Sequence, residues 1–186
     1  MDPVSVLDYR YGTEEMRDVF RANSYLNFLL EVEATLAEAQ AEIGIVPKDA
    51  AVQIRNGIPL VKRERVEEIE SEINHDVMAV VKGLEEQVGE AGKWIHFGAT
   101  SYDIVDTARA LQHKKAINLI EEALSNLIAS IGKLAEEHKD TVMLGRTHGQ
   151  WATPITFGLK MAVFASELSR HMERLIQLKP RILTGK

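Results

Sequence analysis

Residues 101–137 read SYDIVDTARALQHKKAINLIEEALSNLIASIGKLAEE, a run without proline in which Gly132 is the only glycine. Apolar side chains recur in it at alternating spacings of three and four, at Ile117, Ile120, Leu124, Leu127, Ile131 and Leu134. This is the heptad pattern of a helix that packs against other helices. At about 1.5 Å per residue the helix is roughly 50 Å long, longer than a compact domain of this size. We therefore predict a long helix whose apolar seam is covered by further helices.

A second heptad pattern follows Pro154, which we expect to open another long helix. The members of this pattern are Phe157, Met161, Phe164, Leu168, His171, Leu175 and Leu178. Two such seams predict an all-α fold built on a helical bundle. We expect other copies of the chain, sequence beyond Lys186, or both to complete the bundle.

Shorter helices are predicted before the long ones, over residues 24–44, 47–57, 60–73 and 76–88, with Ser24 and Pro47 at helix starts. Residues 94–100, WIHFGAT, show neither helical period nor turn residues, and they predict an extended buried connector. We expect a small N-terminal helical domain over residues 1–92. A long-helix domain follows over residues 93–186.

The composition excludes several classes of protein. The 186 residues are 45% hydrophobic and 27% charged, as in an ordinary soluble globular protein, and the net charge of −6 gives no overall attraction for nucleic acid. The absence of cysteine excludes disulfides, thiolate nucleophiles and cysteine-based metal sites. No secretory signal and no apolar run of about 20 residues is present. We therefore expect a cytoplasmic protein with no metal, no cofactor, and no nucleic-acid or membrane partner.

The stretch Gly98–Asp103, GATSYD, leads into the long helix and is a candidate binding segment. Either Thr100 or Ser101 is suited to be the N-cap, and a helix start offers backbone N–H groups to a carboxylate or a phosphate. Helix capping alone is the alternative interpretation.

The stretch Gly145–Gln150, GRTHGQ, places His148 in a loop before the second long helix. An imidazole there is able to project into a cleft and transfer a proton near neutral pH. A histidine without function is the alternative, although the neighbouring Arg146, Thr147 and Gln150 favour a site.

The triplet Asn74-His75-Asp76 lies between two predicted helices, and by itself it is typical of an ordinary helix entry. We expect His171 to be a buried core residue, and His96 is a candidate for a supporting role behind a site. No histidine or carboxylate pair has metal-ligand spacing, and no phosphate-binding or dinucleotide-binding glycine motif is present.

In this order, the stretches resemble the N-terminal part of the adenylosuccinate lyase family, which belongs to the fumarase/aspartase superfamily. The resemblance covers essentially the whole chain. It begins at Arg10-Tyr11 and continues through NHDV at residues 74–77 and GATS at 98–101, with Asp103 and IVDTA at 104–108 after it. It ends at GRTHGQ at residues 145–150 with PITFG at 154–158. The GRTHGQ stretch is its most specific element.

The resemblance implies elimination of fumarate from adenylosuccinate to give AMP, and from the succinylated carboxamide ribotide to give its aminoimidazole product. It implies that His148 is the general acid on the departing nitrogen and that Thr100 and Ser101 hold a succinyl carboxylate. It further implies that Asn74, His75 and Asp76 contact the substrate and orient the site, and that Arg10 and Tyr11 bind the phosphate. By the same resemblance, residues 93–186 are the first part of a central bundle domain, and the rest of that bundle and a C-terminal domain are absent from this sequence. It also implies a homotetramer whose active sites are shared between subunits.

This sequence departs from the family in lacking the loop SSxMPxKxN, whose serine is the catalytic base. We therefore predict that residues 1–186 alone are inactive. Tyr102 and Trp151 replace residue types that are frequent in relatives. The alternatives are another lyase of the superfamily, such as argininosuccinate lyase or a fumarase-like enzyme, and a helical oligomerisation scaffold without chemistry. His148 argues against aspartase and the muconate cycloisomerases.

Overall fold

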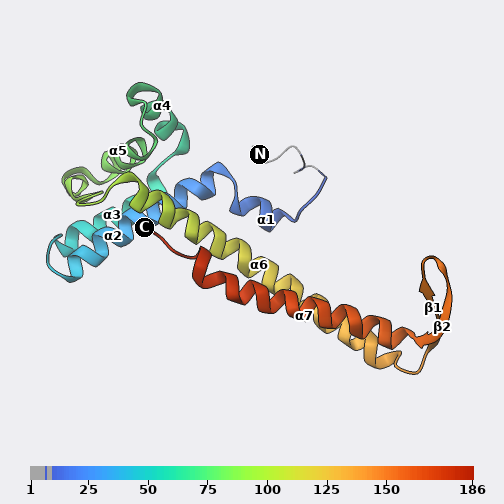
Figure 1. Ribbon diagram of the computed structural model, residues 1–186. Helices are drawn as coiled ribbons and strands as arrows, with labels where there is room; N and C mark the ends of the chain where they lie inside the picture. Colours follow the sequence, from blue (N-terminus) through green and yellow to red (C-terminus); the bar gives the residue numbers. More distant parts are fainter. Residues whose placement is uncertain (1–6, 8–9) are drawn as a thin grey trace. The chain divides into compact units, whose positions relative to one another are not determined.

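The computed structural model describes Leu7 and residues 10–186, and these residues are predominantly helical (Figure 1). The elements in order are α1 (Glu14–Val19), α2 (Ala22–Glu42), α3 (Lys48–Gly57), the 3₁₀ turn η1 (Ile58–Leu60), α4 (Arg63–Ile73), α5 (Asp76–Val88), the 3₁₀ segment η2 (Gly89–Trp94), α6 (Ser101–Glu137), β1 (Val142–Thr147), β2 (Gln150–Thr156) and α7 (Phe157–Ile182). The all-α prediction is confirmed, with the addition of one hairpin. No helix of the described residues combines the length and apolar character that crossing a membrane requires.

The chain divides into two compact units, and the division falls inside α6. The first unit contains the described residues up to Ala116 together with Ile182–Lys186, and the second contains Ile117–Arg181. This division into compact units does not test the domain boundary that we expect after residue 92, which stays a prediction.

The core of the first unit is formed by α2, α3, α5 and the beginning of α6. Leu30, Ile54, Leu84 and Ile104 are fully buried there. Each such side chain contributes about 1.5–3 kcal/mol of hydrophobic stabilisation. The buried Gln112 of α6 donates from Nε2 to the carbonyl of Val19 at 2.9 Å, and so joins α6 to the end of α1.

Helix boundaries in this unit follow the predictions with small shifts. The helices over residues 76–88 and 101–137 begin and end as expected. The helix α2 begins two residues before Ser24, with Arg21 as its N-cap, and Pro47 is the N-cap of α3 and not its first residue. Asn74 ends α4 in the left-handed conformation that asparagine tolerates (φ 54°).

The prediction of an extended buried connector at residues 94–100 is wrong. The segment η2 continues to Trp94, and turns follow it, with Phe97 46% exposed. His96 and Gly98 both have positive φ values, of 59° and 73°. Side chains of α2 hold this turn, and the pattern of residues 94–100 carries no information about these distant contacts.

In the second unit, the C-terminal part of α6 and α7 run side by side, joined by the β1–β2 hairpin (Figure 1). The two predicted seams are only partly buried. One row on each helix is buried or half-buried, namely Ile117, Leu124 and Ile131 on α6 and Met161, Leu168 and Leu175 on α7. The other row is exposed: Ile120, Leu127 and Leu134 on α6, and Phe164, His171 and Leu178 on α7. We call these residues the open rows.

His171 is therefore not the buried core residue that we expected. Its side chain is 50% exposed. Its Nδ1 lies 2.8 Å from Nη2 of Arg174, and its Nε2 lies 3.9 Å from a carboxylate oxygen of Glu167. The histidine belongs to an open row, so nothing in the described chain covers it.

The segment around Pro154 forms a strand, whereas we expected Pro154 to open a helix. Pro154 lies in β2 opposite Leu144, and the pairing is irregular between Leu144 and Arg146. Each strand of a two-stranded sheet has a free edge, so proline can occupy an edge position without losing a ladder bond. The helix α7 begins only at Phe157.

Candidate active site

The start of α6 has the geometry of an anion-binding helix end. The backbone N–H of Thr100 donates to Oδ2 of Asp103 at 2.8 Å, and the N–H of Asp103 donates to the carbonyl of Thr100 at 2.9 Å. The Thr100 N–H and, after it, the ammonium of Lys186 hold the pKa of the Asp103 carboxyl below its ordinary value. The N–H groups of Ser101 and Tyr102, the first two residues of α6, have no acceptor within the helix. They lie beside the hydroxyl groups of Thr100 and Ser101, which suits a carboxylate.

A largely apolar pocket of about 520 Å³ lies along this segment in the first unit. Gly98, Ala99 and Asp103 form one wall, and α2 contributes Val32, Thr35 and Leu36 to the opposite side. Lys186 also lines the pocket, with Nζ 3.5 Å from Oδ1 of Asp103. The predicted segment thus contributes Gly98, Ala99 and Asp103 to the cavity, whereas Thr100 and Ser101 are not among its lining residues.

The turn before Thr100 is held by two polar side chains of α2. One carboxylate oxygen of Glu33 lies 2.6 Å from Nδ1 of His96, and the other accepts the backbone N–H of His96 at 3.1 Å. Nε2 of Gln40 donates to the carbonyl of Phe97 at 2.7 Å. Glu33 is completely buried, and burial raises the pKa of its carboxyl although the bonds from His96 act in the opposite direction.

Glu33 is not among the residues that we predicted from the sequence, although the sequence carries a signal for it. Glu33 lies three and four residues after Leu30 and Leu29, on the apolar face of α2. A charged residue on such a face is buried only when it has a partner. The identity of the partner depends on the tertiary structure.

His75 is the N-cap of α5, and its ring accepts the N–H of Met78 at Nδ1, 3.2 Å away. That bond requires a lone pair on Nδ1, so the proton of the neutral ring lies on Nε2 and is available as a donor. Oδ1 of Asp76 lies 3.7 Å from the same Nδ1, too far for a hydrogen bond, and accepts the N–H of Val77 at 2.8 Å. Asn74, His75 and Asp76 are all exposed.

His148 occupies the tip of the β1–β2 hairpin in the second unit. His148 and Gly149 form a two-residue turn, both with positive φ (52° and 72°), between the paired residues Thr147 and Gln150. This is the arrangement of a type I′ turn, which projects its first residue away from the sheet. The His148 side chain is exposed, and the described part of the chain gives it no hydrogen bond or ion pair.

Gly145 of the GRTHGQ stretch and Gly158 of the TFG stretch lie where the backbone leaves no room for a side chain. A Cβ on Gly145 would lie 2.5 Å from the carbonyl oxygen of Thr153, across the hairpin. A Cβ on Gly158 would lie 2.5 Å from the carbonyl oxygen of Ala135, where α7 crosses the end of α6. These glycines position the hairpin, whereas packing does not explain His148.

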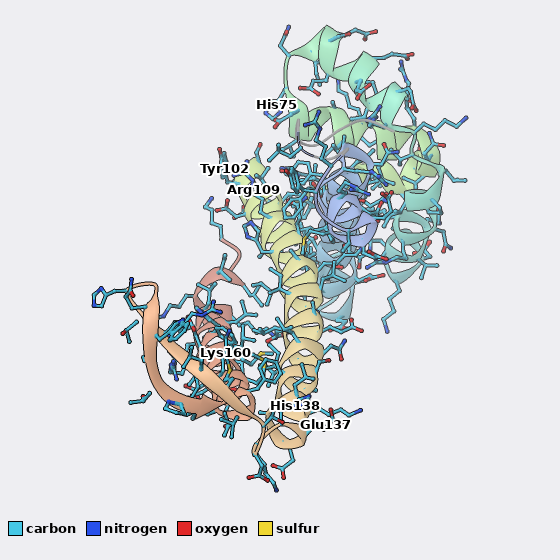
Figure 2. The ribbon with its side chains drawn as sticks, turned by 90° about the vertical axis from the view of Figure 1, so that its right-hand side faces the viewer. His75, Tyr102, Arg109, Glu137, His138 and Lys160 are labelled. Atoms are coloured by element: carbon cyan, nitrogen blue, oxygen red, sulfur yellow. The ribbon has the colours of Figure 1, made fainter. Side chains whose placement is uncertain are left out.

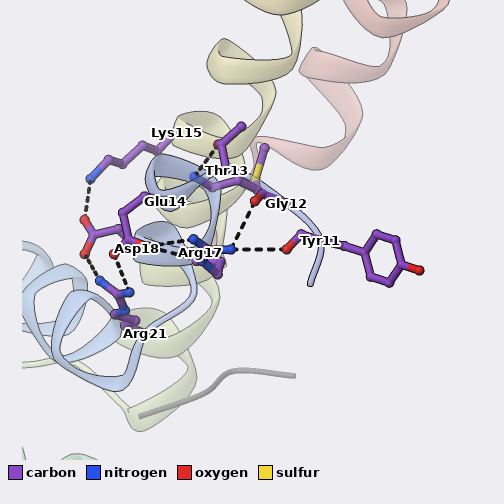
Figure 3. Close-up of polar contacts among 9 residues, drawn as sticks. Tyr11, Gly12, Thr13, Glu14, Arg17, Asp18, Arg21 and Lys115 are labelled. Carbon is purple, nitrogen blue, oxygen red and sulfur yellow. Dashed lines mark hydrogen bonds and ion pairs between the residues drawn. The ribbon is translucent and has the colours of Figure 1, made fainter. Parts of the chain in front are cut away.

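Arg10 and Tyr11 precede α1, and both are exposed (Figure 3). Arg17 donates to the carbonyls of Tyr11 and Gly12 at 3.3 and 3.0 Å, and its guanidinium also pairs with Glu14 at 2.9 Å. The backbone beside Tyr11 is therefore tied to α1, while the phenol projects away from the helix (Figure 3).

The structure places seven of the eight predicted site residues in the first unit and His148 in the second. In Figure 2, His75 and Tyr102 lie toward the same side of the first unit. Tyr102 directly follows Ser101. Among residues 10–186 and Leu7, no group of three or more histidines and carboxylates is arranged to hold a metal ion. The chemistry available is that of an imidazole, hydroxyl groups and a helix start.

Residues 8–186 match the model of a protein family described as lyase. The chain belongs to this lyase family. The adenylosuccinate lyase of Pyrococcus abyssi is 51% identical over 185 residues, which are 98% of this chain and 41% of that relative. The chain thus spans less than half the length of the curated relative, and the predicted resemblance to the adenylosuccinate lyases is confirmed.

Solved structures of lyase-family relatives have the same fold. The fumarate lyase from Mesorhizobium sp. BNC1 matches with a TM-score of 0.84 and 38% identity, over 95% of this chain and 43% of that one. The 3-carboxy-cis,cis-muconate lactonizing enzyme from Pseudomonas putida matches with a TM-score of 0.85 and 33% identity, over 97% and 43%. These matches confirm the superfamily's helical fold and show that it is shared by enzymes whose names indicate different reactions.

Proposed function

We propose that this chain is the N-terminal part of an adenylosuccinate lyase that releases fumarate from adenylosuccinate and from the succinylated carboxamide ribotide. The observation that carries the proposal is the exposed His148 at a hairpin tip, in a chain 51% identical to an adenylosuccinate lyase. A helical scaffold without chemistry leaves that histidine unexplained.

The elimination needs a base, an acid and a site for negative charge. Loss of a proton from the carbon beside a carboxylate places charge on that carboxylate, and the C–N bond then breaks with its electron pair moving to nitrogen. Hydroxyl groups and N–H groups at Thr100 and Ser101 stabilise the developing charge. His148 gives its proton to the departing nitrogen, because histidine is the side chain that most often serves as a general acid.

The other predicted residues bind and orient the substrate in this proposal. The Nε2–H of His75 is a donor toward the substrate, supported by the cap that fixes its ring. Asn74 and Asp76 flank it, and Arg10 and Tyr11 take the phosphate. The base comes from sequence outside this chain, as the family resemblance implies.

The proposed protein is a cytoplasmic homotetramer with active sites shared between subunits. The open rows of α6 and α7 support this proposal, because rows of exposed leucine, isoleucine and phenylalanine at heptad spacing are suited to cover one another. Sharing of sites also gives His148 a reason to lie at the tip of a hairpin, where it can reach another subunit.

A different lyase of the same superfamily is the second candidate. The 38% identity to a fumarate lyase structure favours it, since that identity extends over 95% of the chain. The two candidates share the chemistry at His148 and differ in the group that leaves.

The test uses the full-length protein and measures fumarate release from adenylosuccinate and, in parallel, from argininosuccinate. We expect activity only on the purine substrate, and we expect His148→Asn to lower kcat by about 10²- to 10⁴-fold. Asparagine tolerates a positive φ, so the hairpin turn is kept. The control is His113→Asn, which removes a half-buried imidazole from α6. Unchanged kcat in His148→Asn, or activity on argininosuccinate alone, contradicts the proposal.

A further inference from the structure

Glu33 makes an unusual arrangement with the turn that precedes the carboxylate-binding segment. Its side chain is 0% exposed, and both of its carboxylate oxygens contact one residue, His96, through the ring Nδ1 and the backbone N–H. Two turns further along the same face of α2, Gln40 donates to the carbonyl of the next residue, Phe97. One helix therefore holds two consecutive residues of the turn by three hydrogen bonds.

The turn needs such support because its backbone is strained. His96 has φ 59°, a conformation that costs a side-chain-bearing residue about 1–2 kcal/mol. Only two residues separate the Phe97 carbonyl from Thr100, so the turn determines where α6 begins and where its first N–H groups point. Strain of this kind persists where surrounding contacts determine the conformation, and it is concentrated at functional sites.

Burial of the Glu33 carboxylate costs free energy of desolvation. An apolar side chain at this position would pack with Leu29 and Leu30 without desolvating a carboxylate. Burial raises the pKa of the Glu33 carboxyl, and its interactions with His96 act in the opposite direction. Both polar contacts of Glu33 are made with the turn.

We propose that Glu33 is a positioning residue, which with Gln40 locks the His96–Gly98 turn and so places Thr100 and Ser101 to bind a substrate carboxylate. This inference rests on the proposed function. Glu33 itself lies behind the turn and touches no substrate.

The experiment compares Glu33→Gln with Glu38→Gln in the full-length protein, measuring kcat, KM and the melting temperature. Glutamine keeps the size of Glu33 but removes its charge and one acceptor oxygen, so an Nδ1–H of His96 loses its acceptor while the backbone N–H can keep one. Glu38 is the matched control, because it lies on the same helix and pairs with Arg55 of α3 at 2.6 Å, away from the turn.

We expect Glu33→Gln to lower kcat/KM by about 10- to 100-fold, mainly through kcat, because misplacement of groups that stabilise the transition state has effects of this size. We expect its melting temperature to fall, because the substitution removes one partner of a buried pair. Activity is therefore measured well below the melting transition, where the variant is folded. The double variant Glu33→Gln/His96→Asn is expected to be as active as the less active of the two single variants, because both substitutions act on one turn.

Equal kcat/KM in Glu33→Gln and Glu38→Gln overturns the inference, and so does a loss of activity in Glu33→Gln no larger than the fraction of the protein that is unfolded at the assay temperature. If Glu33→Gln does not fold, Gln40→Met decides, since it removes only the bond to the Phe97 carbonyl. A Gln40→Met protein with the kcat of the unsubstituted protein then overturns the inference. Absence of fumarate release from the unsubstituted protein overturns the proposed function, and this inference with it.

Discussion

At the scale of single residues, His75 combines a structural and a proposed chemical task. Its Nδ1 caps α5 by accepting the N–H of Met78, and this bond leaves the Nε2–H as a donor toward the substrate. A cap of this kind contributes about 0.5–2 kcal/mol to stability. The two tasks use different atoms of one ring, so substitution can separate them.

We predict that His75→Asn keeps the stability of the protein and loses activity, whereas His75→Ala loses both. Asparagine is a good N-cap, and its oxygen is able to accept the N–H of Met78, while alanine cannot. The expected loss of unfolding free energy in His75→Ala is about 1 kcal/mol. Chemical denaturation and fumarate-release kinetics on the full-length variants provide the measurement. A His75→Asn protein with normal kcat/KM would show that the ring serves only as a cap.

At the scale of elements, the junction of α6 and α7 depends on a close approach of two backbones. Gly158 lies at the start of α7, where a Cβ would come within 2.6 Å of Cα of Lys139 and 2.5 Å of the carbonyl oxygen of Ala135. His138 packs edge to face on Phe157 at the same junction, with ring centroids 5.1 Å apart. The hairpin that carries His148 leaves the helix pair here (Figure 1), so the junction sets where the hairpin begins.

The same substitution at two helical glycines is predicted to have opposite effects. Gly158→Ala forces backbone atoms apart and is expected to destabilise the protein by about 1–3 kcal/mol. Gly132→Ala lies within α6 with no atom within 4 Å of the added Cβ. It is expected to stabilise the protein by about 0.5–1 kcal/mol, because alanine favours a helix over glycine. Thermal melts of the two variants measure the effect, and melting temperatures that shift in the same direction contradict the prediction.

At the scale of the whole molecule, the second unit exposes an apolar surface that its own helices do not cover. Ile120 and Leu127 of α6 are 45% and 46% exposed, and Phe164 of α7 is 44% exposed. Exposed rows of this kind indicate association with further helices. In the proposed homotetramer, the open rows form the interface between subunits.

We predict that Leu127→Glu in the full-length protein shifts the assembly to smaller species, because it buries a charge at each copy of the interface. Ser125→Glu is the control, since Ser125 is exposed on α6 outside the open row. Sedimentation velocity at matched concentrations distinguishes the two variants. A tetramer that persists in Leu127→Glu excludes this row from the interface. Dissociation of Ser125→Glu to the same extent would show that added charge alone breaks the assembly.

The sequence alone determined the helical class, the extent of α5 and α6, and the motifs that carry the family resemblance. These properties are local, because proline, glycine and the 3.6-residue period act within one segment. The hairpin was missed because Pro154 argues against a strand, while a two-stranded sheet has free edges that accept it.

Only the tertiary structure decided which apolar row of each long helix is buried and which residue holds the binding segment. A heptad pattern shows that both Leu124 and Leu127 are apolar, but the neighbouring helix determines that Leu127 stays exposed. Glu33 and His96 are 63 residues apart in the chain, and their contact exists only because α2 lies against the turn between η2 and α6. Periodicity describes one helix at a time, whereas burial and hydrogen bonding between distant residues depend on how the helices pack.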